Sequence, residues 1–487
     1  MRKKGLLAAC SALVFVGLAS AGAAAPPTPG ASLPATSPLE QFIATGVLPK
    51  DVTGEPGVWN FAGPASACPG PGWNCTTLGV FPVVQTGTVN VIQCVGVSCS
   101  GSSQTGYANT FECEPEDDRA FPAANGTALQ ECGIDQDGES NQAKCIQKKR
   151  TTPFMRQRCS ITQAGQDNQA TIVQVIEQTS GAIQGAVQEA GVEQTAIASK
   201  NQLQVDQEIK QTTAATPPTT SLDQDAYQVV SGPFGEVGTS GEFPEGPATQ
   251  TAEDDGDSAA QLDQKQVQRA TGGTPQTQND GITTFTPPED CDDFVTSPAD
   301  PNACVNLKQE SETGNNQSQL TQTIDNGAGT AAPAAVQTQG SATGGIDGRV
   351  YQATSSPGSS QNQGNLTEKQ TLVGPAGSTQ FQFGPGWCCG GSQDGPGSEE
   401  INQQAHQEAS EGNAEQVLTL IGISNNEDGN CAIAHDAQNN GAAASESFSF
   451  EPCFPPPIVT TACESGPPPI EGPAAMCTTV AGEFFED

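Results

Sequence analysis

The side chains that could do chemistry in this sequence are cysteines and carboxamides, because no catalytic constellation is visible. The chain has two histidines, His406 and His435, and neither lies in the spacing of a Ser-His-Asp triad. No phosphate-binding loop, dinucleotide fingerprint or nucleophile elbow occurs. We therefore expect no enzymatic activity and no cofactor. An exported enzyme with an unrecognised site is the alternative that this pattern leaves open.

The cysteines indicate disulfides rather than metal binding. The chain has 17 cysteines, 16 of which follow residue 25. An even number in an exported chain predicts a framework of disulfides, with eight bridges as the upper limit. No C-x-x-C pair occurs, so zinc coordination and thioredoxin-like redox chemistry have no support. We expect no bound metal.

The carboxamides belong to an internal repeat. Residues 132–147 and 159–174 align without a gap, and partial copies begin at Gln85 and Gln104. The repeated positions are Gln85, Gly87, Asn90, Gln104, Gly106, Asn109, Gln136, Gly138, Asn141, Ala143, Gln147, Gln163, Gly165, Asn168, Ala170 and Gln174. An Asn-Gln dipeptide opens similar segments at Asn201 and Asn316.

The spacing of the repeat predicts a strand, a turn and a second strand. Side chains alternate between the two faces of a strand, so Cys159, Ile161 and Gln163 share one face. Gly165 permits the positive φ of a tight turn. After the turn, the even positions from Asn168 to Gln174 again share one face. In a stack of such rungs, each inward amide can donate to the copy on one side and accept from the copy on the other, which satisfies every buried polar group.

The same register predicts one disulfide. In a hairpin-like rung, the position four before the repeat Gln lies opposite the position four after the Asn. Those positions are Cys132 and Cys145 in the third copy, so we expect a Cys132–Cys145 bridge. In the fourth copy Cys159 lies opposite Ile172, so Cys159 needs a partner in a neighbouring rung or elsewhere.

The pattern Gln-x-Gly-x-x-Asn-x-Ala-x-x-x-Gln resembles the curlin repeat of bacterial curli subunits. It occurs from Gln136 to Gln147 and from Gln163 to Gln174. The resemblance implies an all-β, curli-like β-solenoid of two-strand rungs with Gln and Asn ladders, and extracellular, amyloid-like fibres of a biofilm matrix. This chain differs in being long, interrupted and rich in cysteine, and it has Gln130 and Gln157 where curlin repeats have serine.

Composition divides the chain into six segments. Residues 1–25 have the basic start, apolar run and small residues of a signal peptide, although the Leu-Ala-Ala-Cys tetrad ending at Cys10 leaves lipidation open. Residues 26–80 are rich in Pro and Gly, and residues 81–211 contain the repeat solenoid. Residues 212–300 are interpreted as an acidic linker or insertions. Residues 301–450 hold degenerate repeats or, alternatively, disordered Gln/Asn-rich sequence, and residues 451–487 form a Pro/Cys-rich tail.

Charge restricts the partners. The formal net charge is −37, with 55 acidic against 18 basic residues, so nucleic acid and anionic lipid are disfavoured by repulsion. No segment after residue 25 approaches the ~20 apolar residues of a membrane span. We therefore expect a secreted structural protein of an extracellular matrix, filament or surface layer, which associates with itself or with other matrix or surface proteins. The alternative is a monomeric, secreted adhesive module that displays loops on a β-solenoid.

Overall fold

The fold was analysed in a computed structural model. The structure describes residues 57–62, 73–77, 82–115, 128–150, 154–179, 181, 183–214, 222–233, 246–271, 276–283, 307–328, 335–339, 346–354, 361–373, 379–388, 398–410, 415–423, 430–440, 443–450, 460–465 and 476–479. The expected signal peptide (residues 1–25) and the two Pro-Pro-Pro-Ile runs of the tail lie outside these ranges.

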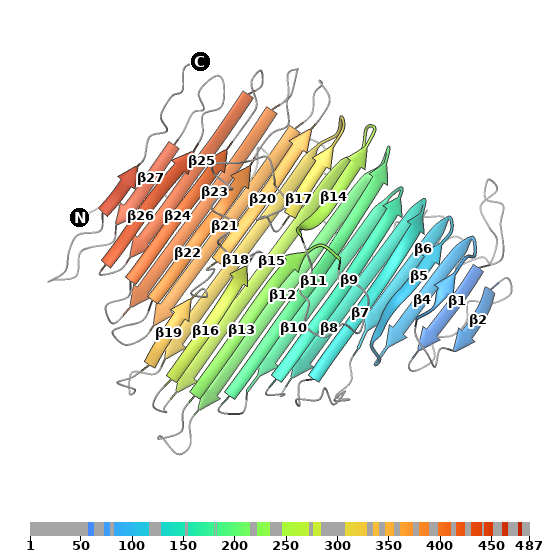
Figure 1. The fold of residues 1–487 in the computed structure, drawn as a ribbon, viewed down its shortest axis with the longest axis horizontal. Helices are drawn as coiled ribbons and strands as arrows, with labels where there is room; N and C mark the ends of the chain where they lie inside the picture. Colours follow the sequence, from blue (N-terminus) through green and yellow to red (C-terminus); the bar gives the residue numbers. More distant parts are fainter. Residues whose placement is uncertain are drawn as a thin grey trace, which may run out of the picture.

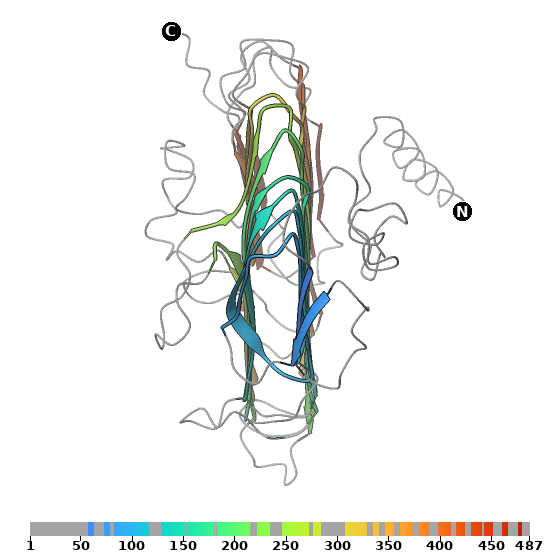
Figure 2. The same cartoon turned by 90° about the vertical axis from the view of Figure 1, so that its right-hand side faces the viewer.

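The described residues form two long parallel β-sheets that pack face to face, with no helix. Figure 1 shows the strands side by side along the stack, and Figure 2 shows the two thin layers edge-on. From β3 onward the chain alternates between the sheets, with the second-sheet part of some rungs divided into two strands. A second-sheet part, a turn and a first-sheet strand make one rung. The expected all-β solenoid of two-strand rungs is therefore confirmed.

The first sheet has thirteen strands. In spatial order they are β2 (Trp73–Thr77), β1 (Gly57–Ala62), β4 (Val89–Val95), β6 (Ala108–Glu114), β8 (Ser140–Arg150), β10 (Asn168–Gln178), β12 (Lys200–Ala214), β15 (Asp257–Thr271), β18 (Asn316–Ala328), β21 (Gln361–Val373), β23 (Ser398–Ser410), β25 (Asn430–Asn440) and β27 (Thr460–Ser465).

The second sheet has fifteen strands. They are β3 (Val84–Gln85), β5 (Cys99–Thr105), β7 (Ala128–Gly138), β9 (Phe154–Gly165), β11 (Ile183–Ile197), β13 (Leu222–Ser231), β14 (Ala248–Glu253), β16 (Gln276–Thr283), β17 (Leu307–Ser311), β19 (Ala335–Gln339), β20 (Ile346–Thr354), β22 (Thr379–Cys388), β24 (Glu415–Ile423), β26 (Ala443–Phe450) and β28 (Met476–Thr479).

The predicted alignment of neighbouring copies of the repeat is confirmed. Asn168 pairs with Asn141 on one side and with Asn201 on the other, and every following position of β10 stays in step with both neighbours. The inward face of the fourth copy, from Cys159 through Ile172 to Gln174, is buried. At the turn Gly165 has a φ of 122° and Asp167 one of 39°, and the turn tip is exposed.

Residues 212–300, interpreted from sequence as an acidic linker or insertions, contribute four strands to the stack in the part that the structure describes. These are β13, β14, β15 and β16, and the acidic EDDGDS sequence spans the turn between β14 and β15. Thr/Pro/Gly-rich insertions hide the repeat here because they divide the second-sheet strand of a rung into two pieces. Both pieces pair with β11, through Gly191 and earlier residues for β13 and from Glu193 onward for β14.

The interior consists of alternating bands of amide and apolar side chains rather than one continuous hydrophobic core. One apolar cluster contains Ile161, Ile172 and Leu203, and a second cluster around Met155, Ile176 and Ile209 lies further from the turn. Columns of buried glutamine separate and flank the two clusters. This arrangement explains how a chain with 34% hydrophobic residues can still bury a long interior, since the amides satisfy one another.

Candidate functional site: the amide ladders

The longest feature of the interior is a column of glutamines beside the turns, on the second sheet. From Gln85 to Gln352, the Nε2 of each glutamine donates to the Oε1 of the preceding one over 2.7–2.8 Å. Its members are Gln85, Gln104, Gln136, Gln163, Gln194, Gln250, Gln309 and Gln352. The second N–H of each amide donates to a backbone carbonyl across the rung, as Gln163 does to that of Gln169 over 2.9 Å. Both donors of each amide are therefore used.

A column of asparagines faces it on the first sheet and has the opposite polarity. Asn90, Asn109, Asn141 and Asn168 each donate from Nδ2 to the Oδ1 of the asparagine in the following rung, over 2.8–3.0 Å. The column continues to Asn201. It is weakened at Ser258, which accepts from Asn201 at 3.5 Å, because a hydroxyl group is shorter than an amide.

Of four further columns, the repeat predicts only the start of the first, at Gln147 and Gln174, and it does not predict the other three. The first-sheet column of Gln147 and Gln174 extends through Gln207, Gln264 and Gln322. A second-sheet column runs through Gln130, Gln157, Gln188 and Gln228. Shorter columns join Gln178, Gln211 and Gln268, and Gln184 and Gln224. The signal that could have identified the second of these is a glutamine six residues before the repeat glutamine.

One of these columns ends at a carboxyl group. Gln322 pairs in register with Glu368, which is fully buried. The Oε1 of Gln322 is buried and has no hydrogen-bond donor. A carboxylate has no N–H to offer it, so the ladder stops at this rung.

We expect Glu368→Gln to stabilise the protein. The new amide would donate to the Oε1 of Gln322 and would remove a buried acidic group, a gain of about 1 kcal/mol or more in the free energy of unfolding. Chemical denaturation measures it, with Glu193→Gln on the exposed face of β11 as the matched control, for which we expect a change within about 0.5 kcal/mol. A midpoint that falls or stays equal to that of the control would contradict this account of the ladder end.

The two sheets are offset along the stack. Amides of the second sheet donate to carbonyls of their own rung, as Gln157 does to Val175. Amides of the first sheet also reach carbonyls of the following rung, as Gln174 does to Glu189, and Gln147 reaches both its own rung and the next. Each first-sheet strand therefore lies across the interior from two second-sheet strands, that of its own rung and that of the next.

This offset corrects the predicted Cys132–Cys145 disulfide. Cys132 is instead bonded to Cys113 of the preceding rung, with the two Cα atoms 6.1 Å apart, and a second bridge joins Cys94 to Cys99. Cys145 is a buried thiol, as is Cys159. The prediction failed because it placed the two strands of one rung directly opposite each other.

At the end of the stack near the N-terminus, the glutamine column begins at an asparagine. The Nε2 of Gln85 donates over 2.5 Å to the Oδ1 of Asn60 in β1, and that oxygen takes the place of a preceding glutamine. Strands β1 and β2 extend the first sheet beyond β4, whereas the second sheet ends in the two-residue strand β3. The two sheets thus end differently here.

Ion pairs on the outward faces also join neighbouring rungs. Lys144 of β8 contacts Glu112 of β6 at 2.9 Å. Glu189 of β11 is fully buried and receives Arg156 at 2.5 Å and Arg158 at 2.9 Å, both from β9. The hydrogen bond to Glu189 raises the pKa of Arg156 despite partial burial, and burial raises the pKa of Glu131 nearby although both arginines oppose the shift. These contacts join neighbouring rungs in addition to the amide ladders.

One pair of stacked carboxylates opposes the fold at neutral pH. Asp206 and Asp263 are register neighbours on β12 and β15. Burial raises the pKa of both above the ordinary 3.8; the charge of Asp263 adds to the shift for Asp206, and that of Glu208 adds to it for Asp263 against the attraction of Lys265. An acid that holds its proton more tightly in the folded state stabilises that state as the pH falls. The contribution of Asp206 and Asp263 to the free energy of unfolding therefore increases as the pH falls from neutral, through their raised pKa values, towards 3.8.

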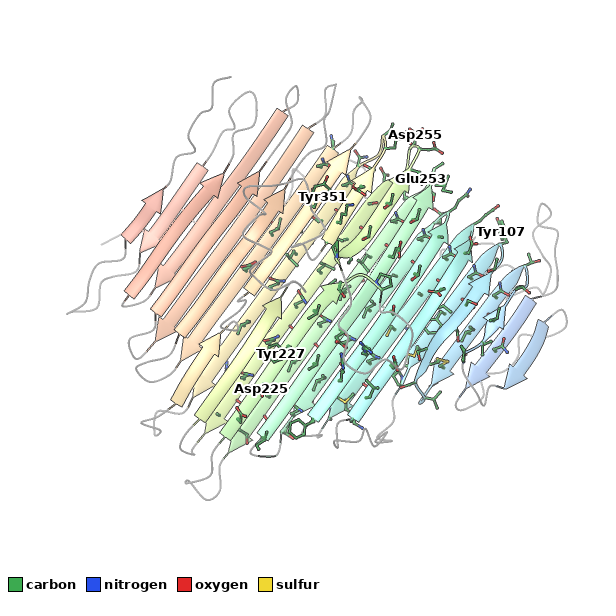
Figure 3. The ribbon with its side chains drawn as sticks, viewed as in Figure 1. Tyr107, Asp225, Tyr227, Glu253, Asp255 and Tyr351 are labelled. Atoms are coloured by element: carbon green, nitrogen blue, oxygen red, sulfur yellow. A yellow bond between two sulfur atoms is a disulfide. The ribbon has the colours of Figure 1, made fainter. Side chains whose placement is uncertain are left out.

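The described residues contain no group of three or more His, Cys, Asp or Glu side chains that could hold a metal ion. His406 and His435 lie on β23 and β25, and their side chains are outside the description. Figure 3 shows Glu253 and Asp255 at the ends of the strands where the turns lie, and Asp225 near the opposite ends of the strands.

The described strands and turns include no helix long and apolar enough to cross a membrane. Comparison of the chain with protein-family models, with curated proteins and with solved structures gives no match.

Proposed function

We propose that the protein is a secreted structural component of an extracellular matrix, filament or surface layer, and that copies associate through stacked β-rungs in a curli-like manner. The observation that carries the proposal is the glutamine column from Gln85 to Gln352, in which the same hydrogen bond recurs in every rung. A column of this kind can be extended by any further rung in the same register, including one supplied by another copy. The working surface would then be the edge strands of the two sheets.

Two other features support export. The two disulfides fit an oxidising compartment, and residues 1–25 have the sequence pattern of a signal peptide. The ion pairs between neighbouring rungs fit a structural protein, because they add contacts along the stacking direction.

A monomeric, secreted adhesive module is the second candidate, and the N-terminal end of the stack favours it. Asn60 occupies the acceptor position that a further glutamine would fill, so the column does not offer this position to another copy. In this case the long insertions between rungs would carry recognition.

The two functions are separated by incubating the oxidised mature chain at pH 7 and at about pH 5. Structural assembly predicts growth to large species in size exclusion and a sharp reflection near ~4.7 Å from aligned material. Growth should be faster at pH 5, because the net charge falls towards the sequence pI of about 4.1 and the pKa values of Asp206 and Asp263 are raised. A persistent monomer at both pH values, with β-rich circular dichroism, would reject assembly and leave the adhesive module.

A further inference from the structure

Six buried cysteines form two facing columns inside the first four rungs. On the first sheet Cys94, Cys113 and Cys145 are register neighbours in β4, β6 and β8. On the second sheet Cys99, Cys132 and Cys159 occupy equivalent positions in β5, β7 and β9. All six are at most 1% exposed.

Two of the three facing pairs are already bonded, and they follow one rule. Cys94 is bonded to Cys99, and Cys113 to Cys132. In both cases a first-sheet cysteine is joined to the second-sheet cysteine of the following rung. The offset of the sheets explains the rule, because it places each first-sheet strand next to the second-sheet strand that follows it.

The third pair has the same relation. Cys145 belongs to the first sheet, Cys159 belongs to the second-sheet strand of the following rung, and the thiols are in hydrogen-bond contact. The next register positions are Ile172 and Ala190. Neither cysteine therefore has another cysteine at the next position of its own column.

We propose that Cys145 and Cys159 form a third disulfide, which completes a covalent zigzag through the first four rungs. The two thiols lose two protons and two electrons as the S–S bond forms. A small-molecule disulfide accepts the two electrons and is released as two thiols. The bridges then join rung one to two, two to three, and three to four in series.

The bond is expected to form while the chain folds. Burial raises the pKa of the Cys145 thiol, and its contact with Cys159 raises it further. Because the thiolate is the reactive form, the closed stack resists oxidation at neutral pH. We therefore expect the thiols to be oxidised efficiently during refolding and slowly once the stack is complete.

A tryptic map of the full chain, refolded with oxidised and reduced glutathione and kept non-reduced, tests the proposal directly. Cleavage after Lys144, Lys148, Arg158 and Lys200 places Cys145 in the peptide 145–148 and Cys159 in the peptide 159–200. We expect these two peptides to be linked to each other. Recovery of 145–148 linked to 120–144, which holds Cys132, would overturn the assignment. The assignment would also be overturned if peptide 145–148 were linked to any other peptide, or if Cys145 and Cys159 were both recovered as alkylated, free thiols.

A variant taken from the next rung provides a second test that preserves packing. Cys145→Ile with Cys159→Ala reproduces Ile172 and Ala190, so the interior stays apolar and filled. Under non-reducing conditions we expect a lower denaturation midpoint than for the parent chain. The difference should become smaller when all bridges are reduced. Equal midpoints under non-reducing conditions would count against the bridge.

Discussion

Replacing Gln163 with glutamate should cost on the order of 4 kcal/mol of the free energy of unfolding. Gln163 is 1% exposed and lies in the middle of the glutamine column. Its Nε2 donates to Gln136 and to the carbonyl of Gln169, and its Oε1 accepts from Gln194. A carboxylate of the same shape keeps the acceptor but loses both donors. The Oε1 of Gln136 and the carbonyl oxygen of Gln169 would then face a buried negative charge without a donor. The rungs on both sides would lose contacts.

Chemical denaturation of Gln163→Glu and of Gln166→Glu measures this effect. Gln166 lies at the exposed tip of the same turn, so its variant makes the same chemical change with an expected cost within about 0.5 kcal/mol. The penalty at Gln163 should shrink as the pH falls towards about 4, because protonation removes the buried charge and restores one donor. Similar midpoints for the two variants at neutral pH would show that the column does not stabilise the stack.

The inward-facing side chains of a rung could be predicted from sequence because they depend only on local spacing. The alternation from Cys159 to Gln163, the glycine at 165 and the alternation from Asn168 onward each follow from the two-residue period of a strand and the backbone demands of a turn. The structure confirms these faces, and it confirms that the Asn-Gln dipeptides of Asn201 and Asn316 open further rungs.

The way in which the two sheets face each other across the interior could not be predicted in the same way. The offset of the sheets depends on how the chain climbs from one rung to the next, and no spacing within a rung encodes it. For that reason Cys132 was assigned to Cys145 instead of Cys113. Gln130 and Gln157 were recognised only as departures from the curlin pattern, because glutamine is as compatible with an exposed position as with a ladder.

The glycines of the turns are the second place where one substitution should have a large effect. Gly106, Gly138 and Gly165 stack on one another, and a Cβ added to Gly138 would lie 1.9 Å from the carbonyl oxygen of Gly106. That oxygen belongs to the backbone of the neighbouring rung and cannot rotate away as a side chain would. The added carbon would also lie 2.7 Å from the Nδ2 of Asn109, so the asparagine column would be disturbed at the same point.

Gly138→Ala should therefore separate the second and third rungs at the turn and cost about 3 kcal/mol. The matched control is Gly133→Ala in the same strand, where the nearest atoms to an added Cβ are at 3.5 Å. That is ordinary contact, so we expect a change within about 1 kcal/mol. Denaturation midpoints compare the two variants, and hydrogen exchange at Asn109 and Asn141 should increase in Gly138→Ala alone. Equal midpoints would mean that the turns tolerate a wider spacing, and the close approach of the glycine backbones would then not be needed for stacking.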